Sequence, residues 1–147
     1  MRFIIIVFCC LICIDISAQI RSRKEIRPEI EALRATLAAA DVIYGRTTGA
    51  GETKAYKAFK KLVEKATIPE LKILVKDKNT VVKGYAFWAL VLRDRKAALL
   101  IKRKFKFSLK KVNTGLYGCI GDRFKLKDFV NIIYSLPDDQ MEFLYTP

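Results

Sequence analysis

The stretch VVKGYAFWAL, residues 81–90, constrains the fold more than any other part of the chain. Its apolar residues recur at helical spacing, and most of the residues between them are apolar too, so that Lys83 is its only charge. A helix that is apolar on every side is normally buried on every side. We therefore expect this helix to occupy the middle layer of the molecule, with Trp88 buried between the helices before and after it.

Helical spacing of apolar residues continues on both sides of this stretch. Residues that commonly cap the start of a helix precede three of the predicted helices, namely Thr67, either Asn79 or Thr80, and Asp94. No segment alternates apolar and polar residues cleanly enough to indicate a strand, so the predicted fold class is all-α. The predicted helices cover residues 28–44, 53–66, 68–75, 81–92, 95–107 and 125–136, with a further short helix within 108–115.

The N-terminus has the anatomy of a secretory signal peptide. Arg2 precedes an apolar run of 12 residues, Phe3 to Ile14, and the small residue Ala18 offers a cleavage site. A membrane-spanning helix needs about 20 apolar residues, so a cleaved leader is favoured over a permanent anchor. We predict a mature protein that begins at Gln19 and is periplasmic or secreted. The predicted segments are a signal peptide at 1–18, a charged arm at 19–27, a helical domain at 28–136 and an acidic tail at 137–147.

The amino-acid composition excludes several kinds of catalytic and metal-binding site. The chain has no histidine, and cleavage would leave Cys119 as its only cysteine. Histidine-dependent nucleophile activation and thiolate or histidine zinc sites are therefore excluded. We expect no catalytic residue, no cofactor and no metal. The alternative is a hydrolase of an envelope polymer that works with carboxylates alone, from Asp138, Asp139 and Glu142.

Charge is distributed unevenly along a chain whose net charge is +13. Residues 83–127 contain 13 Lys and Arg and only two acids, Asp94 and Asp122, whereas residues 128–147 contain four acids and no base. Such asymmetry suggests a partner of opposite charge. The residues expected to bind it are Lys102, Arg103, Lys104, Lys106, Lys110 and Lys111.

Phe105 and Phe107 are interleaved with these cations, a pattern that can grip phosphates and stack bases. Export argues against an intracellular nucleic acid. An acidic protein, an anionic envelope component or peripheral contact with an anionic membrane surface fits better. The alternative is that the acidic tail folds back and occupies this segment. Nothing in the sequence predicts an oligomeric state.

The segment from Ile68 to Phe105 resembles a HEAT repeat. A first helix carries two leucines, an aspartate follows in the turn, and a second helix opens with valine and lysine before its alanines and leucine. YAFWAL and GCIG also resemble strings in small exported HEAT-like bacterial proteins. The resemblance implies a short α-solenoid of helical hairpins that serves as a non-enzymatic binding or scaffold module, with a compact helical bundle as the alternative. The residues that carry it are Leu71, Leu74, Asp77, Val82, Lys83, Ala86, Trp88, Ala89 and Leu90.

Overall fold

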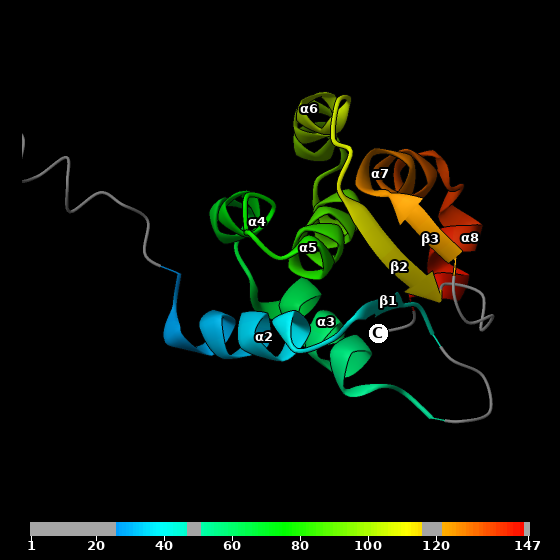
Figure 1. Ribbon diagram of the computed structural model, residues 1–147. Helices are drawn as coiled ribbons and strands as arrows, with labels where there is room; N and C mark the ends of the chain where they lie inside the picture. The colour runs from blue at the N-terminus through cyan, green and yellow to red at the C-terminus, as the bar shows by residue number, and fades with distance from the viewer. Residues whose placement is uncertain (1–25, 47–50, 116–121, 146–147) are drawn as a thin grey trace, which may run out of the picture.

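The computed structural model describes residues 26–46, 51–115 and 122–145, which form seven helices and one three-stranded sheet that lies at one side of the molecule (Figure 1). The predicted leader, the start at Gln19, Cys119 and the GCIG string lie outside the described residues. In chain order the elements are α2 (Pro28–Ala38), β1 (Val42–Tyr44), α3 (Lys54–Lys65), α4 (Ile68–Leu74), α5 (Thr80–Arg93), α6 (Arg95–Phe105), β2 (Lys111–Gly115), β3 (Asp122–Lys125), α7 (Leu126–Ser135) and α8 (Asp138–Leu144).

Helix α5 is the centre of the molecule, as its sequence predicts. Figure 1 shows it with the other elements arranged around it, and it contacts α2, α3, α4, α6 and α7. Trp88 is fully buried, which confirms the prediction, and so are Ala86 and Ala89. The two alanines are three residues apart and lie on one face of α5, where small side chains let a neighbouring element approach closely.

An aromatic cluster joins α5 to α3. The Phe59 ring centre lies 4.6 Å from that of Trp88 and 5.0 Å from that of Tyr85. The rings of Tyr85 and Trp88 are nearly parallel, with 6.4 Å between their centres. The Trp88 Nε1 has no hydrogen-bond partner among the described residues, so this side chain contributes through apolar packing.

The described residues are mostly helical, as the sequence predicts, but they also form a sheet that the prediction of an all-α fold misses. The helix expected over 28–44 ends at Ala38, where the Asn79 side chain donates a hydrogen bond to the last carbonyl of α2. Val42–Tyr44 then forms a strand. The short helix expected within 108–115 is instead β2, in which Val112 and Thr114 are buried while Lys111 and Asn113 are exposed. β-Branched residues favour strands when a partner strand is present.

The sheet has the order β1–β2–β3, with β1 parallel to β2 and β3 antiparallel to it. Val42 lies opposite Asn113 in the first pair, and Val112 lies opposite Phe124 in the second. The other edge of β1 meets α5. There the Tyr85 hydroxyl accepts a hydrogen bond from the Tyr44 N–H (2.8 Å) and donates one to the Tyr44 carbonyl (3.1 Å).

Gly84 allows β1 to approach α5 this closely. A Cβ atom at this position would collide with the Cδ1 of Ile43 and lie 3.2 Å from the Cε1 of Phe129. Both neighbours are fully buried and have little room to move. The only glycine within α5 is therefore explained by contact with the sheet and α7.

Two carboxylates attach α2 to the α4–α5 hairpin. The buried Glu70 caps α4 together with Thr67 and accepts hydrogen bonds from the Arg27 guanidinium, which lower its pKa to about 2. Asp77 pairs with Arg34 of α2 rather than with Lys83. Burial opposes ionisation of Asp77, but the bonds from Arg34 and the Asn79 N–H outweigh it and lower its pKa.

The C-terminal acidic segment forms α8, which packs on the core through Met141 and Leu144. The Tyr56 hydroxyl donates a 2.9 Å hydrogen bond to the carbonyl of Leu144. Asp138 at the start of α8 pairs with Arg95 (2.9 Å), which lies at the first position of α6. Among the described side chains this is the one ion pair between α8 and α6, and Asp139 beside it is exposed.

Candidate functional site

The candidate site is built on α6, whose position is set by its cap and its inner face. The Asp94 carboxylate accepts a 2.9 Å hydrogen bond from the Ala97 N–H and starts the helix immediately after α5. Phe105 packs edge-on against Phe87 of α5, with 6.0 Å between the ring centres. This contact orients α6 so that its inner face is covered and its remaining sides are open. The buried residues of α6 are Ala97, Ala98, Ile101 and Phe105.

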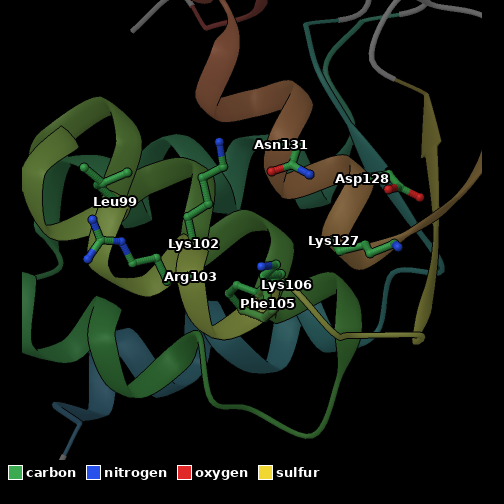
Figure 2. Close-up of a pocket in the computed structure, with 8 residues that line it drawn as sticks. All are labelled: Leu99, Lys102, Arg103, Phe105, Lys106, Lys127, Asp128 and Asn131. Atoms are coloured by element: carbon green, nitrogen blue, oxygen red, sulfur yellow. The ribbon is translucent and has the colours of Figure 1, made fainter.

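A groove of about 500 Å³ runs between α6 and α7 (Figure 2). Helix α7 buries one face against the core, which leaves Lys127, Asp128 and Asn131 on the side that borders α6. The lining therefore combines cations from both helices with one carboxylate and one amide. Figure 2 shows the full lining: Leu99, Lys102, Arg103, Phe105 and Lys106 from α6, and Lys127, Asp128 and Asn131 from α7.

Two cations of α6, Arg95 and Lys102, contact the C-terminal end of α7. Arg95 donates hydrogen bonds to the carbonyls of Tyr134 (2.7 Å) and Leu136 (3.1 Å), and its guanidinium lies 5.3 Å from the centre of the Tyr134 ring. The Lys102 ammonium lies 4.6 Å from the same ring centre. Arg95 therefore has a structural role, and Lys102 is positioned by a cation–π contact at one end of the groove.

The structure separates the six predicted cations into three places. Lys102, Arg103 and Lys106 line the groove, and Lys104 is exposed on α6 outside it. Lys110 and Lys111 follow α6, and both are exposed. We call these six residues (Lys102, Arg103, Lys104, Lys106, Lys110 and Lys111) the basic surface.

The influence of the basic surface reaches α5. Burial and the positive charge of Lys110 lower the pKa of Lys83. Burial is the larger cause, Lys110 is the one residue of the basic surface that adds to it, and Asp77 opposes both.

The sequence interpretation missed the α7 side of the groove, namely Lys127, Asp128 and Asn131. A usable signal was present, because these positions lie opposite the apolar stripe of α7 and must face away from the core. Their proximity to α6 depends on tertiary packing, which a helical pattern does not report.

The groups that line the groove can bind an anion. Ammonium and guanidinium groups can bind phosphate, sulfate or carboxylate, and the Asn131 amide can add a hydrogen bond. Within the described residues no three His, Cys, Asp or Glu side chains gather as a metal site would require. Asp138 and Asp139 are exposed, and the described acids with shifted pKa values, Glu70 and Asp77, are shifted downward, opposite to the direction of a general acid.

The described residues thus define a small helical protein with a buried central helix and a basic, partly apolar groove between two others. Comparisons with protein-family models, with curated proteins and with solved structures gave no match to this chain. None of the helices in the described ranges is both long and apolar enough to cross a membrane.

Proposed function

We propose that this protein is a non-enzymatic binding module that acts outside the cytoplasm and holds an anionic partner on the basic surface. One observation carries the proposal. All six cations of the basic surface lie within ten residues of chain, and none forms an ion pair with a carboxylate in the described part of the molecule. Unpaired like charges repel one another, and an anionic partner would relieve that repulsion.

The contrast with other cations of the chain supports this proposal. Arg27, Arg34, Lys60, Lys65 and Arg95 each pair with a carboxylate. The protein therefore uses ion pairs widely to connect its elements, but not on the outer part of α6. Exposed lysines of α3 such as Lys54 and Lys57 also form no ion pair in the described part of the chain, so what distinguishes the basic surface is the density of its unpaired cations.

The HEAT-like character of the α4–α5 hairpin belongs to the same proposal. Support comes from the packing of α4 on α5, with Asp77 in the turn and Leu71 and Leu74 buried. Because α5 contacts five other helices, we favour a HEAT-like hairpin inside a compact bundle over a linear solenoid. Native-state hydrogen exchange tests this choice: a bundle should exchange its core amides in one cooperative opening, and a solenoid in separate steps along the chain.

The binding proposal is tested with inorganic polyphosphate as the anionic probe, across a series of salt concentrations. Exposed charges are screened over about 8–10 Å at ordinary salt, so binding should weaken steeply as salt is added. Replacing Arg103, Lys104 and Lys106 together with Glu should abolish binding and leave the circular dichroism spectrum unchanged.

The matched control replaces Lys54, Lys57 and Lys61 with Glu. These lysines are exposed on α3, and the change in net charge is the same. The control should bind nearly as well as the wild type. Equal loss in both variants would reduce the effect to net charge, and salt-independent binding would contradict the proposal.

The location outside the cytoplasm is tested by N-terminal sequencing of the protein recovered from cells that export it. We expect the mature chain to begin at Gln19. A mature form that retains Met1 to Ala18 would indicate an anchor instead of a cleaved leader.

A further inference from the structure

Large hydrophobic side chains are exposed in one place in the described part of the chain. They are confined to 11 consecutive residues that begin on α6 and end just before β2. An exposed cluster of apolar residues on an otherwise well-packed protein marks a surface that contacts something other than water. The exposed fractions are 38% for Leu99, 61% for Leu100, 83% for Phe107 and 73% for Leu109.

These side chains point away from the core because of their helical positions. Lys96, Leu100 and Arg103 are spaced by four and three residues, which places them along one outer stripe of α6 opposite its buried residues. Phe107 lies in the turn that follows α6 and is exposed. Leu109 follows in the connection between α6 and β2. The surface therefore alternates apolar side chains with cations along its length.

Cations surround the apolar side chains. Lys102, Arg103, Lys104 and Lys106 lie between the two pairs of hydrophobic residues, and the Lys106 ammonium lies 5.5 Å from the centre of the Phe107 ring. Residues 95–121 contain no acid. A partner that fits this surface must offer negative charge and apolar material within a few ångströms of each other.

We propose that this surface docks on a bilayer that contains anionic phospholipids, with Phe107 and Leu109 inserted between the headgroups. This inference rests on the proposed function and names its partner. A soluble polyanion would pair with the cations but would leave Phe107 and Leu109 in water. The interface of a bilayer places phosphate groups directly beside acyl chains and so satisfies both halves of the surface.

The two components should act together. Each Lys or Arg held near an anionic bilayer surface strengthens partitioning about fivefold. Insertion of two large apolar side chains should add about tenfold or more, since each removes apolar surface from water. Neither component alone gives stable anchoring, and peripheral binding of this kind typically needs both.

The test measures sedimentation of the full chain with vesicles of phosphatidylcholine, either pure or with about one third phosphatidylglycerol as the anionic lipid. The apolar run Phe3–Ile14 has its own affinity for lipid, so it is retained in every variant and each result is a ratio to wild type. The double variant Phe107→Ser with Leu109→Ser should bind anionic vesicles about tenfold or more weakly. It should bind polyphosphate as the wild type does.

A second measurement reports insertion at one position. Trp88 is the only tryptophan and is fully buried, so it gives a constant background. The emission of a Phe107→Trp variant should shift to shorter wavelength with anionic vesicles and be quenched by brominated lipid. The emission of a Lys57→Trp variant, with the new side chain exposed on α3, should do neither.

The outcomes separate this inference from the proposed function. If the double serine variant binds anionic vesicles as wild type does, or the Phe107→Trp emission does not move, lipid docking is overturned. Salt-sensitive binding of polyphosphate would in that case leave the proposed function standing, with a soluble polyanion or an acidic protein as the partner. Binding of the Arg103, Lys104 and Lys106 variant to anionic vesicles at the wild-type level would overturn the electrostatic half of the inference. We expect the Arg103, Lys104 and Lys106 variant to lose binding to both vesicles and polyphosphate. We expect the serine variant to lose binding to vesicles alone.

Discussion

Helices α5 and α6 follow each other with only Asp94 between them, and both carry apolar residues outside a single helical stripe. In α5 those extra residues, such as Phe87 and Trp88, are buried, because other helices surround it. In α6 the corresponding residues, Leu99 and Leu100, are exposed, because α5 and α7 cover only its inner side. An apolar residue beyond the main stripe therefore indicates a central helix or an interaction surface, and only the neighbours decide which.

The contrast between α5 and α6 is tested most strongly by comparing the stability of the Trp88→Ala variant with that of the Leu100→Ala variant. We expect Trp88→Ala to lower the free energy of unfolding by about 3–5 kcal/mol, because it empties a large buried site. Leu100→Ala should change it by about 0.5 kcal/mol or less. Urea unfolding followed by circular dichroism measures both, since Trp88 is the only tryptophan and its removal eliminates the fluorescence signal. Similar losses in the two variants would contradict the contrast between the helices.

Low pH should weaken the contact between α2 and α4, which depends on the buried carboxylate of Glu70. The pKa of Glu70 is lowered from 4.5 to about 2 in the folded protein, so its contribution to stability is full above about pH 4.5 and is lost as the pH falls toward 2. Replacing Glu70 with Gln should cost about 2–3 kcal/mol at pH 7, and this cost should shrink steadily below about pH 4.5.

Urea titrations at several pH values measure the effect of Glu70. Glu64→Gln is the control, because this exposed carboxylate of α3 forms no ion pair in the described part of the chain. A cost of Glu70→Gln that stays the same between pH 7 and pH 3 would show that the carboxylate charge is not what stabilises the α2–α4 contact.

Gly84→Ala tests how tightly α5 is enclosed. The added methyl group would press on Ile43 and Phe129, and overpacking of this kind costs about 1–3 kcal/mol. The better helix propensity of alanine offsets up to about 1 kcal/mol of it. We expect a net loss of about 1–2 kcal/mol, measured by thermal unfolding. The exposed position Ser135 of α7 supplies the control, because Ser135→Ala should be neutral or slightly stabilising.

The smallest effect concerns the junction of the two helices. Asp94→Ala removes the cap of α6 and should cost about 1 kcal/mol. Asp94→Asn keeps a capping oxygen and should recover most of that loss. If both variants lose the same amount, the charge of Asp94 rather than its hydrogen bond to Ala97 stabilises the start of α6.

The helices and their caps were predictable because their signals are local. The Thr67–Glu70 capping box, the Asn79 cap and the burial of Trp88 all follow from patterns within a few residues. The sheet was not predictable in the same way. Val42 pairs with Asn113, a partner that is remote in sequence, and strands of three to five residues are too short to show a period.

The sequence predicted the α6 side of the candidate site but not its α7 side. Lys102, Arg103 and Lys106 followed from charge density alone. The α7 side of the groove required knowledge of which helix packs beside α6. The exposure of Phe107 and Leu109 also needed the structure, because an apolar residue near a helix end is equally compatible with burial.

Self-association by strand addition is restricted at one edge of the sheet. A strand added to β1 would need the N–H and carbonyl of Tyr44, and the Tyr85 hydroxyl already occupies both. Tyr85 is fully buried in α5, so a second chain could not displace it without opening the core. A central helix that stabilises the fold thereby also closes this edge against the growth of intermolecular β-structure.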